Sequence, residues 1–368
     1  MTRTGRPLKV AVTTKPLDNW NSGSGHHLDE LLTHVLDIAD REYPDGFDFT
    51  FVHYNKSENP LYKRVHELLI PRNPFSASRA LGRQNYDIIH YTPLSIFAPI
   101  WVKSPKKTAT IHGIEERLFP QGYPLHHRLH EYYLHPAYMR MMDGIATVSE
   151  TGKAWFIDNY GIKKDRIIVT PNAVSPQYRV LPASETQKTG KPYILHISRF
   201  SERKNPQGIM GGFAEFIALS GLDVDLVCAG KGWNSDEALE FARFYGIFDR
   251  YHAPGFIETE EAVRLLNGAE AFVFPSWAEG FGMPNLEAMA CGCPVVTSSI
   301  FAIPEVVGEA GILVSRPDAR SEIARALADI CTNPSLRSSL IEKGFAQARK
   351  FDWNESARAI LSFWKSLA

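Results

Sequence analysis

Cysteine, excess charge of one sign and long apolar runs are all scarce in this chain of 368 residues. Its four cysteines exclude a small fold held by disulfides, and the lack of a secretory leader points to a reducing cytoplasm. A formal net charge of −1 gives no reason to expect nucleic acid as a partner. No apolar run approaches the ~20 residues that cross a bilayer, so only peripheral contact with a membrane stays open.

Two short motifs raise the question of a metal site. Cys291 and Cys293 have no second pair of cysteines or histidines at zinc spacing, so we interpret them as small residues packed at a helix end. Asp223 and Asp225 imitate a D-x-D metal motif, but they open a predicted strand, at the wrong end of a sheet for a ligand cleft. We therefore expect no metal requirement and no tightly bound cofactor.

The remaining composition, 44% hydrophobic and 22% charged residues, is that of a globular protein. Short apolar runs alternate with segments of helical periodicity, a pattern typical of parallel sheets covered by helices on both faces. The predicted strands are residues 8–14, 47–54, 86–91, 106–112, 144–149 and 166–171 in the first half, and 192–198, 224–230, 271–276, 294–299 and 311–315 in the second.

One polar, proline-containing stretch interrupts this alternation and divides the chain. It predicts a Rossmann-like domain over residues 1–175, a linker over 176–192 and a second Rossmann-like domain over 193–350. The expected fold class is α/β, with two doubly wound domains facing across a cleft. The final helix, 351–368, carries an apolar stripe that needs cover, and we expect it to pack toward the first domain.

The segment 275–294 carries the strongest functional signal. Gly280 and Gly282 allow a tight turn after a buried strand, and Pro284 suits the start of a helix, where free N–H groups and the helix dipole favour a diphosphate. Glu279 precedes this helix and Glu287 lies about one turn inside it. Carboxylates there accept hydrogen bonds from sugar hydroxyls, so the segment predicts a nucleotide-sugar site.

Two cations follow the first strand of the second domain. Arg199 could offer forked hydrogen bonds to a diphosphate, and Lys204 could add a point charge. Spacing alone favours a solvated charged loop, but an anion site in the same domain favours phosphate binding.

Glycines and a histidine mark two strand ends in the first domain. Gly23 and Gly25 lie between the first strand and a helix that is expected from Leu28, and they permit a tight turn against phosphate or sugar. They do not complete a dinucleotide fingerprint. His112 ends a predicted strand, where it could donate a hydrogen bond to a sugar hydroxyl. A flexible loop and a structural histidine are the alternatives.

Residues 115–142 combine histidine, aromatic and basic side chains on a helical pattern. His126 and His130 have the i, i+4 spacing of metal ligands but lack the H-E-x-x-H pattern, so we expect no metal there. A helix packed on the first domain and a helix that touches a lipid-linked acceptor remain the two interpretations.

Together these residues resemble the retaining nucleotide-sugar glycosyltransferases of family 4, which have the GT-B fold. The resemblance covers nearly the whole chain and is strongest over residues 144–314. The matching blocks include ATVSE, VTPNAV, ISRFSERKN, IPEVVGEAGILV and the family's E-x7-E motif at Glu279 and Glu287. Two departures are Gly113, where the family often has aspartate, and Ala173, where it often has glycine.

The resemblance implies a role for each candidate residue. The first domain would bind the acceptor and the second the donor. Arg199 and Lys204 would hold the donor diphosphate, Glu279 the donor sugar hydroxyls and Glu287 the ribose. The remaining implied contacts are backbone N–H groups of Phe281, Gly282 and Met283 at the sugar and phosphate, Gly25 near the phosphates, and His112 near the transferred sugar.

The implied reaction is hexosyl transfer with retention, in which Arg199 and Lys204 stabilise the departing diphosphate. The donor would be a GDP- or UDP-sugar of the GDP-mannose or UDP-glucose type. The acceptor would be a glycan or lipid-linked glycan in cell-surface polysaccharide assembly. An epimerase or phosphorylase of the same architecture and a non-catalytic nucleotide-sugar-binding protein are the alternatives.

Overall fold

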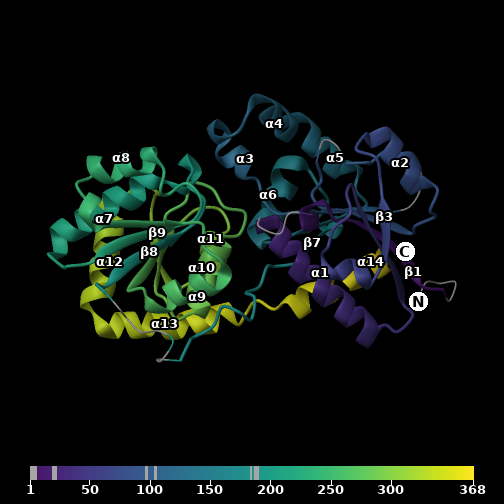
Figure 1. The fold of residues 1–368 in the computed structure, drawn as a ribbon. Coiled ribbons are helices and arrows are strands. Elements are labelled where there is room, and N and C mark those ends of the chain that lie inside the picture. Colours follow the sequence, from purple (N-terminus) through teal and green to yellow (C-terminus); the bar gives the residue numbers. More distant parts are fainter. Residues whose placement is uncertain (1–5, 19–22, 96–97, 103–105, 183–184, 186–189) are drawn as a thin grey trace. The chain divides into compact units, whose positions relative to one another are not determined.

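The computed structural model describes residues 6–18, 23–95, 98–102, 106–182, 185 and 190–368. The chain divides into two compact units (Figure 1). Unit 1 comprises Met1–Arg117, Tyr123–Asn172 and Asp352–Ala368, and unit 2 comprises Leu118–Gly122 and Ala173–Phe351. Each unit is built on one sheet of parallel strands, so the predicted α/β class with two domains of parallel sheet is confirmed.

Unit 1 contains a seven-stranded sheet in the order β3-β2-β1-β4-β5-β6-β7. The strands are β1 Leu8–Thr13, β2 Phe47–His53, β3 His66–Leu69, β4 Ile88–Tyr91, β5 Lys106–Ile111, β6 Gly144–Thr147 and β7 Ile167–Val169. Its helices are α1 Gly23–Glu42, α2 Pro74–Gly82, α3 Glu115–Leu118, which ends at the unit boundary, α4 Leu125–Leu129, α5 His135–Met141, α6 Glu150–Tyr160 and α14 Trp353–Leu367. One turn of π-helix, His130–Leu134, joins α4 to α5.

Unit 2 contains a six-stranded sheet in the order β10-β9-β8-β11-β12-β13. The strands are β8 Tyr193–Ile197, β9 Asp225–Ala229, β10 Tyr251–Gly255, β11 Ala271–Phe274, β12 Val295–Ser298 and β13 Gly311–Val314. Its helices are α7 Pro206–Ser220, α8 Asp236–Phe244, α9 Thr259–Gly268, α10 Met283–Ala290, α11 Ile303–Val307, α12 Arg320–Thr332 and α13 Pro334–Ala348.

The two strands that the apolar pattern does not predict, β3 and β10, are both edge strands. β3 has the sequence HELL and is largely exposed, and β10 contains Pro254. An edge strand needs no continuous apolar run, and it tolerates proline because one of its sides makes no ladder hydrogen bonds. Central strands such as β4 and β11 are buried along their whole length, as expected for parallel sheets.

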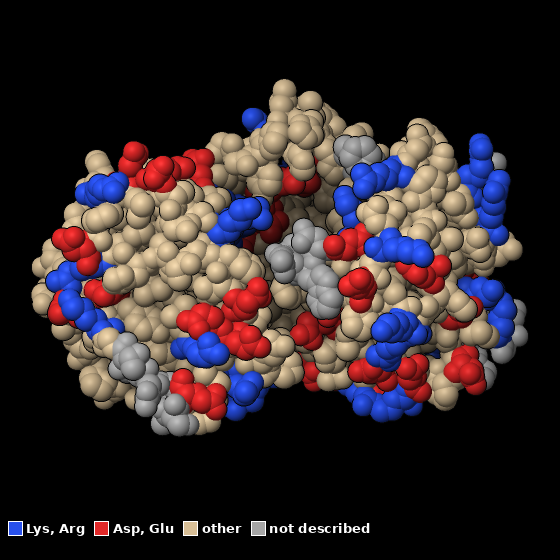
Figure 2. Space-filling model, in the orientation of Figure 1, with Lys and Arg blue, Asp and Glu red and all other residues tan. Residues whose placement is uncertain are grey.

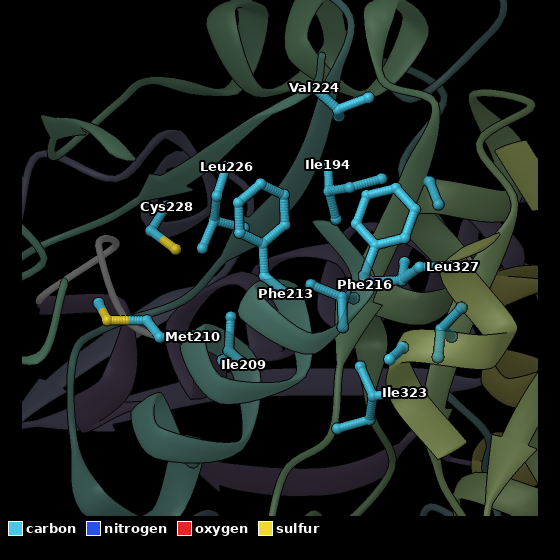
Figure 3. Close-up of a cluster of buried hydrophobic side chains, with 14 of the residues drawn as sticks. Ile194, Ile209, Met210, Phe213, Phe216, Val224, Leu226, Cys228, Ile323 and Leu327 are labelled. Atoms are coloured by element: carbon cyan, nitrogen blue, oxygen red, sulfur yellow. The ribbon is translucent and has the colours of Figure 1, made fainter. Parts of the chain in front are cut away.

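The core of unit 2 lies between the sheet and helices α7 and α12 (Figure 3). Phe213 and Phe216 of α7 pack against β8 and β9, and Ile323 of α12 packs beside them. Gly212 permits this approach, because a Cβ there would stand 2.7 Å from the Cγ2 of Ile323. Asn205, directly before Pro206, caps α7 by accepting a hydrogen bond from the N–H of Gly208; asparagine at the N-cap followed by proline is a local signal for a helix start.

Helix α14 is part of unit 1 and packs along α1. The apolar stripe expected from its sequence is buried throughout, and Ser356 donates a hydrogen bond to the carbonyl of Pro171 at 2.7 Å. The buried stripe comprises Trp353, Ala357, Ile360, Leu361 and Trp364. The end of the chain thus completes the core of the unit that contains its beginning.

Candidate functional site

The turn between β11 and α10 forms the backbone of the candidate site in unit 2. Gly282 is the N-cap of α10 at φ 93°, a left-handed conformation that glycine adopts without strain. Pro284 lies in the first helical turn, as predicted, and Leu286 and Met289 are buried. Among the described residues no side chain caps this end of α10. Pro284 has no N–H and the N–H of Asn285 donates to the carbonyl of Gly282, so the N–H groups that an anion could use here are those before Pro284.

Glu279 is the centre of a polar cluster in front of this turn. It is 7% exposed, and its Oε1 accepts hydrogen bonds from Ser276 Oγ at 2.6 Å and Arg203 NH1 at 3.0 Å. Lys204 Nζ forms an ion pair with the same oxygen. Burial raises the pKa of this carboxyl, but the charges of Lys204 and Arg203 more than offset burial, so its pKa lies below the ordinary value.

Lys204 reaches Glu279 because two loops are tied together. The 3-10 turn Glu202–Lys204 follows β8, and the carbonyl of Arg203 accepts hydrogen bonds from Trp277 N at 2.9 Å and Ser276 Oγ at 3.1 Å. Asn205 holds the same loop by donating to the carbonyl of Pro275 at 2.9 Å. The sequence predicts Lys204 but not Arg203 or Ser276, although both stand within three positions of a predicted residue.

Arg199 takes a different position from Lys204. Its side chain is exposed on the loop after β8, and it takes no part in the Glu279 contacts. The structure therefore brings Lys204 and Glu279 into direct contact, while Arg199 extends into solvent.

Glu287 lies on α10 and meets a residue that the sequence does not predict. The hydroxyl of Tyr178, from the segment before β8, forms a hydrogen bond with its carboxyl. Burial raises the pKa of Glu287 to about 7, and the bond from Tyr178 offsets only part of that rise. At neutral pH this carboxyl is poised between its protonated and ionised forms.

Asn285, in the first turn of α10, is a further polar residue that the sequence analysis misses. Its side chain is fully buried, and neither its Oδ1 nor its Nδ2 has a hydrogen-bond partner among the described residues. Its backbone N–H donates a hydrogen bond to the carbonyl of Gly282 at 3.0 Å.

In unit 1 a histidine pair lies at the strand ends. His112 directly follows β5, and its ring meets that of His27, on α1, edge to face with centroids 4.3 Å apart. His27 Nδ1 lies 2.6 Å from Asn172 Oδ1, so this nitrogen carries the proton. Burial lowers the pKa of His112 to about 4 and that of His27 well below 6.5, so both rings are neutral at pH 7.

The expected start of the first helix is wrong. The helix begins at Gly23 rather than near Leu28, so Gly25 lies in its first turn and not in a preceding loop. Helical backbone reaches this far because the buried His27 packs against His112 and Trp353, which fixes the turn that contains Gly25. The remainder of the predicted glycine loop, residues 19–22, lies outside the described residues.

The Asp223 and Asp225 side chains of the D-x-D motif are occupied by other contacts. The carboxylate of Asp223 forms ion pairs with Lys191 at 3.0 Å and Arg250 at 2.6 Å. Asp225 is the first residue of β9, and its Oδ2 lies 2.7 Å from Nε2 of His252. Across the described ranges, no three histidine, cysteine or acidic side chains gather as a metal site would require. The helices in the same ranges include none with the length and apolar character of a transmembrane span.

Two protein families match consecutive parts of the chain. The family described as Glycosyl transferases group 1 matches residues 179–347, and Glycosyltransferase Family 4 matches residues 26–178. O-antigen chain mannosyltransferase B of Escherichia coli is 29% identical over 318 residues, which are 84% of this chain and 81% of that protein. The serotype-specific mannosyltransferase WbdA of Escherichia coli is 27% identical over 277 residues, 72% of this chain but only 34% of WbdA.

Solved structures share the fold over nearly the whole chain. Sucrose-phosphate synthase from Thermosynechococcus elongatus superposes with a TM-score of 0.78 at 18% identity, covering 98% of this chain and 99% of that one. Anabaena HepE, solved in complex with UDP-glucose, gives a TM-score of 0.72 at 17% identity, covering 97% and 100%. At these identities the likeness is one of fold.

Proposed function

The chain belongs to glycosyltransferase family 4, and from this membership we propose that it moves a hexose from a nucleotide-diphosphate sugar to a hydroxyl of a glycan or glycolipid. The anomeric configuration is retained. The observation that carries the proposal is the Glu279 cluster in front of the open end of α10. It combines cations, a buried carboxylate and free backbone N–H groups at one place.

The charge of this cluster suits a diphosphate. Lys204 and Arg203 contribute two positive charges and Glu279 one negative charge, so one positive charge remains beside the first turn of α10. The exposed Arg199 adds a third cation, and the N–H groups of Phe281, Gly282 and Met283 complete the cradle. These groups stabilise the negative charge that grows on the leaving diphosphate.

Glu279 and Glu287 take different parts of the donor. The three protein donors converge on Oε1 of Glu279, so Oε2 is the oxygen that accepts from a hydroxyl of the transferred sugar. Glu287 accepts hydrogen bonds from the ribose in its ionised form, and the neutral His112 donates one to the sugar. The acceptor hydroxyl attacks on the face that the diphosphate leaves, and the diphosphate takes its proton.

The donor we propose is GDP-mannose or a related GDP- or UDP-hexose, and the setting is cell-surface polysaccharide assembly. The names of the mannosyltransferase relatives support mannose, and the UDP-glucose complex of HepE supports a nucleotide-diphosphate sugar. An epimerase would bind the same donor through the same cluster. The two activities are therefore distinguished by identifying the reaction product. A non-catalytic nucleotide-sugar-binding protein would also bind the donor, so formation of a transfer product separates it from the enzyme.

A donor screen tests this proposal. Melting is measured with GDP, UDP and ADP, and the preferred nucleotide at 100 times its Kd stabilises the fold by about 2.7 kcal/mol. Transfer from the matching sugar nucleotide then yields a product whose anomeric configuration is read by NMR. Transfer persists in EDTA, since no step needs a metal. The proposal fails if millimolar nucleoside diphosphates leave the melting temperature unchanged.

A further inference from the structure

Unit 2 contains a cavity of about 360 Å³ at the end of α10 opposite to the Gly282 turn. Its volume lies in the range of small-molecule sites. Every residue that lines it belongs to unit 2, from the segment before β8, the last residue of α10, the end of α13 and Phe351. The small side chains of Ala290 and Ala348 stand at its wall and leave the space open. The proposed transfer reaction does not use this space.

Two arginines and no acidic residue line the cavity. Arg179 precedes β8, Arg349 follows α13 as its C-cap, and both side chains are exposed. Arg179 donates a long hydrogen bond to the carbonyl of Gln177 at 3.4 Å, and neither guanidinium is paired with a carboxylate of the described residues. Figure 2 shows acidic and basic side chains interspersed over unit 2, so the arginine pair is a local feature. Guanidinium groups bind phosphate oxygens through forked hydrogen bonds, which makes a phosphate the matching anion.

The walls of the cavity decide which kind of phosphate suits it. Their apolar part comprises Val174, Pro176, Val180, Phe345 and Phe351. The hydroxyls among the lining residues are those of Ser175 and Tyr178. The several hydroxyls of a bare sugar phosphate would lose water there without gaining partners, which is unfavourable, whereas an aromatic or aliphatic group gains from leaving water. The cavity therefore suits an organic phosphate with an aromatic or aliphatic body.

Two residues that line the cavity also contact the candidate donor site. The hydroxyl of Tyr178 forms a hydrogen bond with the carboxyl of Glu287. The ring of Phe351 meets that of Phe281 edge to face, with centroids 5.5 Å apart. Phe281 belongs to the turn before α10, whose backbone N–H groups we assign to the donor. A molecule that packs on Tyr178 and Phe351 is therefore one residue away from the ribose carboxyl and from the phosphate turn.

We propose that this cavity is a regulatory site for an organic phosphate with an apolar body, and that its occupation strengthens nucleoside diphosphate binding. Arg179 and Arg349 bind the phosphate group. The apolar body packs against Phe345, Phe351 and the ring of Tyr178. The strengthening rests on the proposed function, whereas binding of the phosphate in the cavity does not.

The direction of this coupling follows from Tyr178. Its hydroxyl donates to Glu287 and lowers the pKa of that carboxyl, which favours the ionised form that accepts hydrogen bonds from a ribose. A body packed on the ring of Tyr178 holds this hydrogen bond in place. The bound phosphate therefore favours the nucleotide, and the nucleotide favours the phosphate by the same factor. We expect a factor of about five to ten, which is within the usual range of such coupling.

Isothermal titration calorimetry of the full chain, without donor or acceptor, tests the cavity. The probe is naphthyl phosphate, which combines an aromatic body with a phosphate group, and inorganic phosphate and naphthol each supply one half of it. We expect the probe to bind at least about tenfold more tightly than either half, because each half loses one of the two kinds of contact.

Charge reversals locate the probe. Arg349→Glu places a carboxylate beside the phosphate and weakens probe binding at least about tenfold, and Arg179→Glu repeats the test from the segment before β8. The matched control is Lys350→Glu, an equal charge reversal at an exposed neighbour that does not line the cavity, and it leaves binding within about twofold. Lys204→Ala weakens nucleoside diphosphate binding and leaves probe binding unchanged. Melting curves verify that each variant is folded.

The coupling is measured as the Kd of the preferred nucleoside diphosphate with and without saturating naphthyl phosphate. The wild-type affinity rises about five- to tenfold. Tyr178→Phe still binds the probe but loses most of this gain, because the hydroxyl that contacts Glu287 is absent. Arg349→Glu keeps the wild-type affinity for the nucleotide and shows no gain.

The regulatory site is overturned if the wild type does not bind naphthyl phosphate at millimolar concentration, or if both arginine variants bind it as well as the wild type. It is also overturned if Lys204→Ala abolishes probe binding, since the probe then occupies the donor site. A nucleotide affinity that the probe leaves unchanged contradicts the coupling alone. A chain that binds no nucleoside diphosphate contradicts the proposed function and the coupling together, while probe binding in the cavity is decided by its own titration.

Discussion

The polar cluster of unit 2 holds three charges, whereas that of unit 1 is made of neutral rings. Glu279 is buried but stays ionised, because Lys204 and Arg203 lie on its Oε1. His27 is buried and His112 partly buried, neither has an acidic partner among the described residues, and desolvation holds their pKa values below neutrality. Each cluster lies at the carboxyl ends of parallel strands, so position alone does not set its charge.

The difference shows how each unit deals with the free-energy cost of burying an ionisable side chain. A buried charge is tolerated only when opposite charge and hydrogen bonds replace water. Unit 2 meets this condition and offers a charged site suited to phosphate. In unit 1 the cost does not arise, because the imidazole rings of His27 and His112 are neutral at pH 7. Neutral rings can still form hydrogen bonds, and they suit uncharged partners such as sugar hydroxyls.

The largest expected effect comes from breaking the charge pairing in unit 2. Lys204→Ala leaves Glu279 with Arg203 as its sole cation, so we expect a loss of about 3 kcal/mol in the free energy of unfolding. The transfer rate falls at least about tenfold, or about 1.4 kcal/mol of barrier. Urea unfolding and steady-state kinetics measure the two effects.

Lys191→Ala is the matched control, because Lys191 pairs with Asp223 at the opposite end of the sheet, in solvent. It costs less than about 1 kcal/mol and leaves transfer unchanged. Equal effects of the two alanines on the transfer rate would remove Lys204 from the mechanism.

A second prediction concerns Glu287, whose carboxyl is not paired with a cation in the part of the chain that the structure describes. Its pKa is raised from 4.5 to about 7 in the folded state, so the fold loses stability as pH rises through this window. The total loss is roughly 3 kcal/mol and is absent from Glu287→Gln, so unfolding free energies at pH 5 and 8 separate the two proteins.

Nucleoside diphosphate binding has the opposite dependence, because only the ionised Glu287 accepts two hydrogen bonds from a ribose. Affinity rises as pH passes 7 in the wild type and stays flat in Glu287→Gln. The exposed Glu309→Gln, in the same unit, is the control and behaves as the wild type. A wild-type affinity that does not change between pH 6 and 8 contradicts the ribose role.

The smallest effect is expected in the neutral cluster. His27→Gln removes a hydrogen bond to Asn172 and a ring contact with His112, which costs about 1 kcal/mol at pH 7. The lowered pKa of His27 makes the wild type lose stability as pH falls below 6.5, and the variant loses less. The two denaturation curves therefore converge toward pH 5.

The neighbouring His26→Gln is the control, since its side chain is exposed. It leaves both the stability at pH 7 and its acid dependence as in the wild type. A His27→Gln protein with the same acid dependence as the wild type would show that His27 is protonated in the fold.

The sequence predicts most of unit 2 because its signals are local. The Asn-Pro caps, Gly282 and the buried run of β11 each depend on a few adjacent residues. The edge strands β3 and β10 escape prediction because partial exposure relaxes their apolar pattern. The early start of α1 escapes it because His27 is stabilised by residues far away in sequence.

Site residues follow the same division. Lys204, Glu279 and Glu287 belong to short motifs that can be read along the chain. Tyr178 carries no motif of its own, and it joins the candidate site only because the fold places it beside Glu287. Asn172 belongs to the VTPNAV block, but only the fold shows its contact with His27. Asn285 belongs to no motif read from the sequence, and only its burial without a hydrogen-bond partner among the described residues distinguishes it.

The sequence by itself determined the α/β class with two domains of parallel sheet and the residue types of the Glu279 cluster, because periodicity and turn chemistry act over a few residues. Only the tertiary structure decided which of these groups are charged. Burial and partners from distant segments set each pKa: Glu279 is ionised by two cations, Glu287 titrates near pH 7 beside Tyr178, and His112 is neutral beside His27. These long-range environments leave no trace in local spacing.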